Sequence, residues 1–165
     1  MTDLAALHEK AKGEGKICAV GAIIRDARGR VFVHRRGPDR RFLPGCWDLV
    51  GGHVEAGEDL LTALRREIEE ETGWALSGTP ALMHVEDWVA DGPNGPEPHR
   101  EFDFCVEVAG DLGRPRIERP KHVEFRWIGP EETSILDENR GADGGFIRRI
   151  VEIALSRADA MAQGQ

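Results

Sequence analysis

The stretch from Gly51 to Gly73 constrains the fold of this chain more than any other. Two glycines directly follow a short apolar run, and a segment with helical periodicity begins a few residues later. Paired glycines permit a close approach of the backbone to a neighbour, and also positive φ. The periodic segment ends at Gly73 and predicts a helix over 58–72, built as one unit with the strand and loop before it. Its apolar positions are Leu60, Leu61, Leu64 and Ile68.

Three glutamates of this helix share one face. Glu67, Glu70 and Glu71 stand at positions i, i+3 and i+4, which 3.6 residues per turn bring together. Like charges at this spacing destabilise a helix by about 0.2–0.5 kcal/mol per pair, and Arg66 can offset part of this by pairing with Glu70. A solvated acidic face explains the helix as well as a cation site does. The glycine pair favours the cation site, because Mg²⁺ is usually held by a few carboxylates and by phosphate oxygens at about 2.0–2.1 Å.

The rest of the chain alternates between runs of strand length and loops rich in Gly and Pro. Residues 1–15 are predicted to be a short helical extension, and 144–162 an amphipathic C-terminal helix. The segments 17–26 and 31–36 are predicted to form a hairpin. Further strands are expected over 47–50, 81–90, 100–108 and 122–128, with a short helix over 130–136. This order predicts a mixed α/β or α+β sandwich, and the length of 165 residues predicts a single domain.

Composition narrows the class of protein. The net charge of −8 argues against binding of extended nucleic acid, because such proteins carry a basic surface. It allows a small anionic substrate, because a metal ion or a local arginine cluster reverses the sign of a pocket. No apolar run reaches the ~20 residues of a membrane span, and the N-terminus lacks the apolar core of a signal peptide. Three widely separated cysteines predict free thiols and a cytoplasmic location.

The stretch from Gly52 to Trp74 resembles the signature of the Nudix hydrolases. The positions that match are Gly52, Glu58, Arg66, Glu67, Ile68, Glu70, Glu71, Gly73 and Trp74. Trp74 is the one departure, since the family usually has an aliphatic residue there, and we expect it to change packing rather than function. The resemblance implies an α/β/α sandwich with a mixed β-sheet. It also implies hydrolysis of a nucleoside diphosphate linked to a group X, with Mg²⁺ as cofactor and Mn²⁺ as the alternative.

The resemblance further implies which residues carry the chemistry. Glu67, Glu70 and Glu71 are expected to bind the metal ion, and the carbonyl of Gly51 is expected to be a further ligand. Water would attack a phosphorus atom of the diphosphate, because a bound metal lowers the pKa of water and neutralises phosphoryl charge. Glu67 and Glu71 are the two candidates for the general base, and the sequence leaves the choice open.

Supporting residues are expected around this set. Arg66 and Glu58 are expected to shape the loop and orient the carboxylates, as groups that contact ligating residues do. Some members of the family supply one more carboxylate from a late strand. Glu118 and Glu124 lie on or near the corresponding strand here, and an ordinary exposed glutamate is the alternative for each.

Substrate contacts are predicted before and beside the helix. Arg35 and Arg36 end a strand and can bind phosphates with two parallel hydrogen bonds. Gly52 lets the backbone approach a ligand. Trp47 and Trp88 offer rings on which a base can stack, with packing in the core as the alternative for Trp47. The histidines show no ligand spacing and are assigned no role.

Several functions fit the signature. The leading one is hydrolysis of a nucleoside triphosphate, oxidised ones included, and the first alternative is hydrolysis of ADP-ribose or another nucleotide sugar. A nucleotide-sensing domain without catalysis would normally have lost one of the three metal glutamates, and all three are present. An isomerase of prenyl diphosphates would use a cysteine, for which Cys46 is the candidate. The C-terminal helix either covers the core or forms a homodimer; the sequence decides neither this nor the substrate.

Overall fold

The computed structural model describes residues 1–141 and 145–163, with side chains up to residue 157. The described strands form two sheets. In the four-stranded sheet the order is β4-β1-β6-β5; β1 and β6 run parallel and the other neighbours antiparallel. In the three-stranded sheet the order is β3-β2-β7, all antiparallel. The strands are β1 (Ile17–Ile24), β2 (Val31–Arg36), β3 (Trp47–Asp48), β4 (Val50–His53), β5 (Ala75–Gly92), β6 (Gly95–Ala109) and β7 (His122–Ile128).

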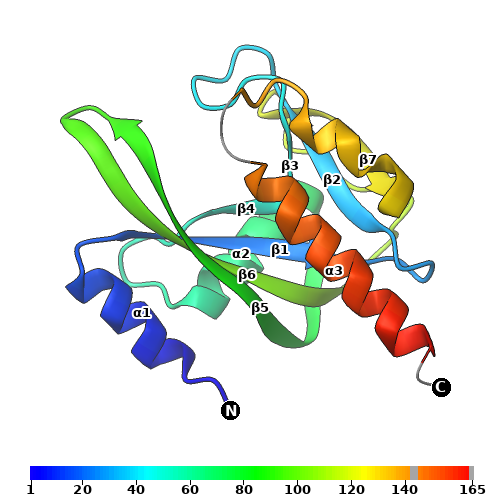
Figure 1. Ribbon diagram of the computed structural model, residues 1–165, viewed down its shortest axis with the longest axis horizontal. Coiled ribbons are helices and arrows are strands. Elements are labelled where there is room, and N and C mark those ends of the chain that lie inside the picture. The colour runs from blue at the N-terminus through cyan, green and yellow to red at the C-terminus, as the bar shows by residue number, and fades with distance from the viewer. Residues whose placement is uncertain (142–144, 164–165) are drawn as a thin grey trace.

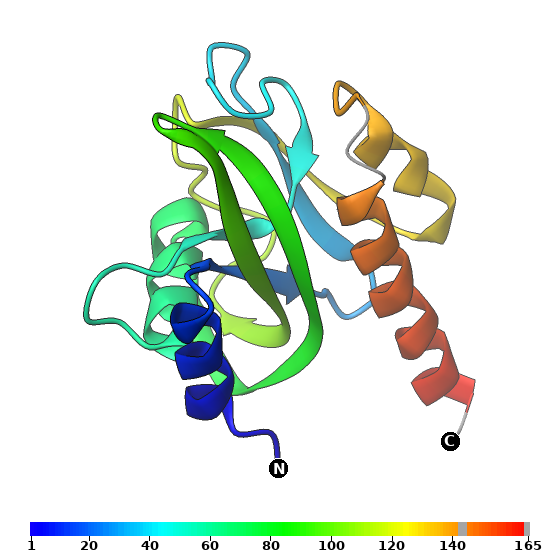
Figure 2. The same ribbon diagram turned by 60° about the vertical axis from the view of Figure 1, so that its left-hand side comes forward.

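Helices cover the four-stranded sheet on both faces. The helices α1 and α2 lie on one face, and α3 lies on the other beside the three-stranded sheet (Figures 1 and 2). The helices are α1 (Leu4–Gly13), α2 (Leu60–Thr72), α3 (Phe146–Gln163) and the 3-10 helix η1 (Pro130–Asp137). None of the described helices is long and apolar enough to cross a membrane. The architecture confirms the predicted α/β/α sandwich with a mixed sheet.

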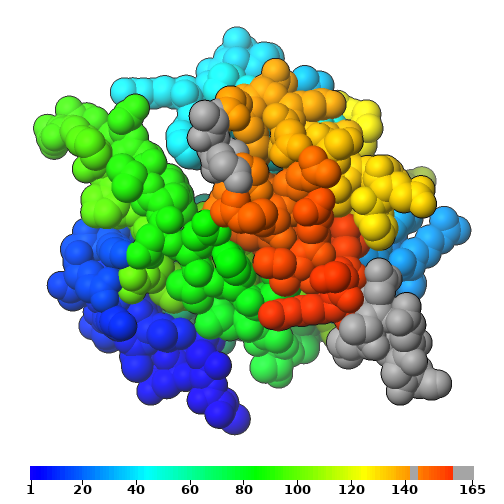
Figure 3. Space-filling model, in the orientation of Figure 1, coloured from blue at the N-terminus to red at the C-terminus, as the bar shows by residue number. Residues whose placement is uncertain are grey.

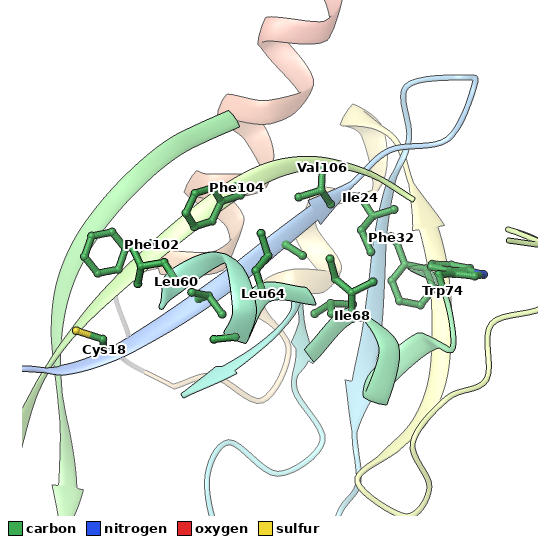
Figure 4. Close-up of a cluster of buried hydrophobic side chains, with 14 of the residues drawn as sticks. Cys18, Ile24, Phe32, Leu60, Leu64, Ile68, Trp74, Phe102, Phe104 and Val106 are labelled. Carbon is green, nitrogen blue, oxygen red and sulfur yellow. The ribbon is translucent and has the colours of Figure 1, made fainter. Parts of the chain in front are cut away.

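Strand β1 is buried on both faces and separates two apolar clusters. Cys18, Val20 and Ile24 face α2 in the first cluster, which Figure 4 shows together with Leu64 of that helix. Ile23 points the other way, toward α3. Successive side chains of a strand alternate between faces, so one strand supplies both clusters. A strand buried in this way reads as a continuous apolar run rather than as an alternating one.

The helix α2 begins and ends where its sequence provides caps. The side chain of Asp59 accepts a 2.7 Å hydrogen bond from the backbone N–H of Thr62, so the helix starts at Leu60 rather than at the predicted residue 58. Gly73 adopts φ 73° and donates its N–H to the carbonyl of Glu69. A left-handed residue at this position is the usual end of a helix, and glycine adopts it without steric cost. The cap therefore ends α2 where the sequence predicted.

The prediction of a hairpin over 17–26 and 31–36 is wrong. The strands β1 and β2 belong to different sheets and share a single bridge, between Arg25 and Val31. Asp26 accepts hydrogen bonds from the N–H groups of Arg28 and Arg30, so the turn itself is well formed. Beyond the turn, β1 pairs with β4 and β6 instead.

The observed bounds of several other elements also differ from the predicted ones. The predicted strand 47–50 is two strands, because the chain leaves the three-stranded sheet after β3 and enters the four-stranded sheet at β4. The strands β5 and β6 extend past the predicted limits into a long hairpin (Figure 1). The segment predicted as a short helix over 130–136 is the 3-10 helix η1. The described part of α3 agrees with the C-terminal helix, whose predicted start at residue 144 lies outside the described residues.

Candidate active site

The glycine pair lies on β4, the edge strand that α2 packs against. A Cβ atom on Gly51 would lie 2.2 Å from the carbonyl oxygen of Val20 on β1, and one on Gly52 would lie 2.3 Å from Oε1 of Glu67. Contacts below 3.0 Å essentially do not occur for real Cβ atoms, so a side chain at Gly51 would force the backbone of β1 away, and one at Gly52 would displace the carboxylate of Glu67. Neither glycine has positive φ. Gly51 therefore serves the close approach of β4 to β1, and Gly52 that of α2 to β4.

The three glutamates of α2 do not share one exposed face. Glu67 and Glu71 are buried, at 5% and 1% exposure, and only Glu70 is exposed. Oε2 of Glu71 accepts a 3.0 Å hydrogen bond from the N–H of Gly51. Burial raises the pKa of Glu67, and it raises the pKa of Glu71 to about 7 against the opposing effect of Lys121. The helix thus points two carboxylates at β4 and leaves one in solvent.

Arg66 connects the loop after β4 to these carboxylates. Its guanidinium donates two hydrogen bonds to Glu58, at 2.8 and 2.9 Å, and one of 2.7 Å to Glu67. It also donates to the carbonyl of His53 at 3.0 Å and lies 3.4 Å from a carboxylate oxygen of Glu70. The guanidinium lowers the pKa of Glu58 to about 2. This geometry fits the expected positioning role of Arg66 and Glu58.

Lys121 enters the site from the segment before β7. Its ammonium nitrogen lies 2.9 Å from Oε1 of Glu71 and 3.4 Å from a carboxylate oxygen of Glu118. Glu118 is thus brought to the edge of the site, and its role as an extra carboxylate stays a prediction. Glu124 lies on β7, where a carboxylate oxygen of its side chain is 3.7 Å from a guanidinium nitrogen of Arg35 on β2. No sequence pattern indicated Lys121, because its partner Glu71 is fifty positions away along the chain.

Two histidines pack beside Glu71. The rings of His34 on β2 and His122 on β7 stack with centroids 3.4 Å apart and planes at 11°. With Glu71 they are the one group of three metal-ligand side chains that the described residues bring within 4.8 Å of one another. Burial lowers the pKa of His34 to about 4 and that of His122 to about 2, so both rings are neutral. Parallel rings direct their nitrogen lone pairs side by side, so the pair fits a packing role better than convergence on one ion.

The remaining predicted contacts divide into two kinds. Arg35 and Arg36 hold the loop 37–46 through its backbone, with their Nε atoms donating to the carbonyls of Gly45 at 3.0 Å and Phe42 at 2.9 Å. Trp47 is 2% exposed and packs in the cluster beneath α3. Trp47 therefore packs in the core, which was the alternative to base stacking, and its ring is not open to a base. Trp88 on β5 is half-buried, and its ring stacks on that of His99, with centroids 4.0 Å apart.

The donor set suits a hard divalent cation. Oε2 of Glu67 is buried and has no hydrogen-bond partner among the described residues. Glu70 and Glu71 add oxygen atoms one helical turn away, and oxygen ligands are those that Mg²⁺ prefers. A buried carboxylate oxygen without a partner is costly unless a ligand completes its coordination. The residues present therefore fit the metal ion that the signature implies.

Comparison with known proteins agrees with this geometry. The family model described as NUDIX domain matches residues 16–150. The chain belongs to the Nudix hydrolases. It is a hydrolase that acts on phosphorus-containing anhydrides, and members of this family generally use divalent metal ions.

Named relatives and solved structures support the membership. The chain is 40% identical over 141 residues to an RNA pyrophosphohydrolase of Dinoroseobacter shibae, covering 72% of this chain and 78% of the relative. It is 31% identical over 131 residues to an RNA pyrophosphohydrolase of Caulobacter vibrioides, covering 71% and 74%. Its fold matches a NUDIX hydrolase from Nitrosomonas europaea with a TM-score of 0.67 over 86% of this chain and 90% of that one, at 20% identity.

Proposed function

We propose that this Nudix hydrolase cleaves the diphosphate bond of a nucleoside triphosphate, oxidised ones included, with Mg²⁺ or Mn²⁺ as cofactor. The observation that carries the proposal is the burial of Glu67 and Glu71 against Gly51 and Gly52, beside the exposed Glu70. Acidic surface helices keep their carboxylates in solvent. Two carboxylates held under the backbone of an edge strand instead form a site for a cation and the phosphates it binds.

The metal ion would be held by Glu67, Glu70 and Glu71, with the carbonyl of Gly51 as a further ligand. When bound, it would neutralise phosphoryl charge and lower the pKa of the attacking water. Arg66 would act as a positioning residue, because it contacts Glu58 and Glu67 together. A rigid arrangement of this kind matters, since a misplacement of about 1 Å can cost on the order of 10²-fold in rate.

The general base would be one of the two buried glutamates. Glu71 hydrogen-bonds to the N–H of Gly51 and pairs with Lys121, so its orientation is fixed. Glu67 keeps one carboxylate oxygen without a partner among the described residues. A base must reach the proton that it removes, and both carboxylates border the same strand.

A second substrate class is favoured by the relatives and by one structural feature. Two relatives are named RNA pyrophosphohydrolases, which suggests the 5′-triphosphate end of an RNA as the substrate. The ring of Trp88 stacks on that of Phe42, with centroids 5.9 Å apart, and Phe42 is exposed. Exposed aromatic faces bind successive bases by stacking. The net charge of −8 favours a short contact with the RNA end over an extended one.

The sensing, isomerase and ADP-ribose functions have less support. The three metal glutamates are all present, and two of them are buried in place, which does not fit a sensing domain without catalysis. Cys46 is buried, and its thiol donates to the carbonyl of Asn139, so it does not fit the cysteine of an isomerase. No contact among the described residues favours ADP-ribose.

A panel assay tests the proposal. The protein is incubated with Mg²⁺ or Mn²⁺ and with nucleoside triphosphates, oxidised ones, ADP-ribose, or a short 5′-triphosphate RNA, and the products are identified. Nucleoside monophosphate and pyrophosphate from free triphosphates support the proposal. Release of pyrophosphate from RNA alone would shift the function to the second class. Absence of hydrolysis across the panel with both metals would overturn it. The Glu70→Gln/Glu71→Gln variant controls for contaminating activity.

A further inference from the structure

A half-open cavity lies at the far end of β1, beside the turn that follows this strand. Its volume is about 680 Å³, within the range of about 300–1,000 Å³ that holds small-molecule ligands. The turn 25–30 forms one wall, β6 and the bulged part of β5 form the floor, and Leu155 of α3 lies at the opposite wall. Figure 3 shows the turn, in blue at the right-hand edge, beside the yellow segment where β7 leads into η1.

The cavity is separate from the catalytic site. Gly51 of the catalytic strand pairs with Gly21 of β1, and Arg25 follows Gly21 by four residues, roughly 13 Å along the chain. Ile23 points toward α3, and Arg25, two residues later, points to the same face. The helix α2 covers the other face of the sheet. A ligand in this cavity would therefore contact none of the three metal glutamates.

Arginine side chains give the cavity a positive charge. Arg25, Arg28 and Arg30 line it, and they outnumber the two carboxylates of its described lining, Asp26 and Glu107. Asp26 is already paired, because the guanidinium of Arg30 lies 2.7 Å from one of its oxygens. The side chains of Arg25 and Arg28 have no ion pair and no hydrogen bond within the described part of the chain. The cavity thus offers unpaired cationic groups in a chain whose net charge is −8.

The thiol of Cys105 marks the place where two of the cationic groups converge. It lines the cavity and lies 3.7 Å from the sulfur of Met83. Burial raises the pKa of Cys105, and the guanidinium groups of Arg25 and Arg157 oppose this shift. Arg157, an exposed residue of α3, also has no ion pair among the described residues. An anion beside Cys105 would therefore have a guanidinium group on each side of it.

The remaining lining is apolar. Ala81 of β5, Pro130 of η1 and Leu155 of α3 contribute to it. Small-molecule sites combine such a lining with a few polar groups that fix the orientation of the ligand. An inorganic anion would use the arginines and leave the apolar lining in water. A ligand with an anionic head and an apolar body would use both, because burial of apolar surface is favourable.

We propose that this cavity binds a phosphate monoester with an aromatic or other apolar body, with the phosphate between Arg25 and Arg157 and the body against Ala81 and Leu155. A guanidinium group binds phosphate oxygens through two parallel hydrogen bonds. A phosphate monoester carries a charge of about −1.5 to −2 near pH 7, which matches two guanidinium groups better than the single charge of a carboxylate does. The site goes beyond the proposed hydrolysis and does not depend on it.

Alkylation of Cys105 tests the site directly. The metal-free protein reacts with iodoacetamide, and mass spectrometry follows each cysteine; Cys18 and Cys46 are buried and serve as internal references. With a Kd of about 1 mM or tighter, phenyl phosphate at about 10 mM should slow the alkylation of Cys105 by about tenfold or more, because the bound ligand covers the thiol. Inorganic phosphate should slow it less, since it lacks the apolar body. Phenol, which lacks the phosphate, should leave the rate unchanged.

Variants assign this protection to the two arginines. Loss of a charge-assisted hydrogen bond weakens binding by about tenfold, so Arg25→Gln and Arg157→Gln should each reduce the protection to about twofold. Protection is the ratio of the rates with and without ligand in each variant, because loss of a guanidinium also changes the reactivity of the thiol. The matched control is Arg65→Gln, an exposed arginine of α2 on the other face of the sheet, which should keep full protection. Glu70→Gln should also keep it, because the cavity is separate from the catalytic site.

Three results would overturn the proposal. They are no slowing by phenyl phosphate, equal slowing by inorganic phosphate or phenol, and full protection in both folded arginine variants. A Tm for each variant shows that it is folded. Nothing is hydrolysed in this assay, so its outcome is independent of whether the protein cleaves nucleoside triphosphates.

Discussion

The ammonium nitrogen of Lys121 lies 2.9 Å from Oε1 of Glu71, a carboxylate that is 1% exposed. This cation and the bound metal ion of the proposed function would neutralise the same buried charge. Removing the only counter-charge of a buried carboxylate strongly destabilises the folded protein. Replacing that counter-charge by another cation does not leave the carboxylate unpaired. Loss of Lys121 should therefore lower the stability of the metal-free protein and increase the stabilisation that a bound metal ion provides.

Lys121→Ala should destabilise the metal-free protein by about 1–2 kcal/mol, less than for a fully buried pair because the lysine is partly exposed. The Tm should fall by about 3–6 °C. Mg²⁺ should then raise the Tm of the variant more than that of the wild type, because the ion restores a positive charge beside Glu71. Thermal unfolding across a Mg²⁺ titration measures both effects. Lys12→Ala, on the exposed face of α1, is the control and should change neither. An equal Mg²⁺ response in wild type and Lys121→Ala would contradict the argument.

The three glutamates of α2 should respond differently to amidation. Glu71→Gln keeps an oxygen for the N–H of Gly51 but removes the buried charge, so it should lower kcat by about 10²–10³-fold while the protein stays folded. Glu70→Gln should lower kcat without changing the Tm, because Glu70 is exposed. The double variant should have no measurable turnover. Glu69→Gln changes a neighbouring exposed carboxylate and should retain wild-type kcat. Wild-type turnover in the double variant would remove the metal assignment.

The course of α2 could be predicted because its signals are local. Apolar spacing, Asp59 before the helix and Gly73 after it all lie within one short stretch. The same stretch of sequence also indicates that two glutamates of α2 are buried. Glu67 and Glu71 follow Leu64 and Ile68 at intervals of three, so they continue the apolar stripe of the helix. A charged residue inside such a stripe is the sign that distinguishes a buried carboxylate from a solvated one.

The rest of the site depends on contacts between distant parts of the chain. His34, Glu71 and Lys121 come from β2, α2 and the segment before β7, and no local pattern joins them. The hairpin prediction failed for the same reason, since a turn at Asp26 does not decide which strands pair across a sheet. No local pattern singles out Asp103 either, and its contact with Glu101 appears only in the folded chain, where both carboxyl groups lie against Gly21.

Gly51→Ala should be among the most destabilising single changes in the site. The new Cβ would lie 2.2 Å from the backbone oxygen of Val20, which cannot rotate away, so β1 and β4 must separate. Overpacking of this kind costs about 1–3 kcal/mol. Gly57→Ala is the matched comparison, because Gly57 has φ 85° but open space around it, and should cost about 1 kcal/mol. Urea unfolding gives both values. A smaller loss for Gly51→Ala than for Gly57→Ala would show that β4 adjusts more easily than its contacts indicate.

Asp103→Asn should stabilise the protein more at pH 8 than at pH 5. The pKa of Asp103 is raised in the folded state, so between its unfolded and folded pKa the folded protein binds a proton that the unfolded chain has released. Stability is then lost as the pH rises through this window. The carboxylates of Glu101, Glu86 and Asp48, on three strands, all raise this pKa. Arg140 is the cation near Glu101 and opposes the shift there.

The amide that Asp103→Asn introduces would be neutral at every pH and could donate to Glu101, so the variant removes this cost. We expect a gain of about 1–2 kcal/mol at pH 8 that is smaller at pH 5, measured by urea unfolding at both pH values without nucleotide. Glu107→Gln, an exposed change on the same strand, should show no such difference. A loss of stability at pH 8, or a gain independent of pH, would mean that Asp103 is ionised and structurally paired.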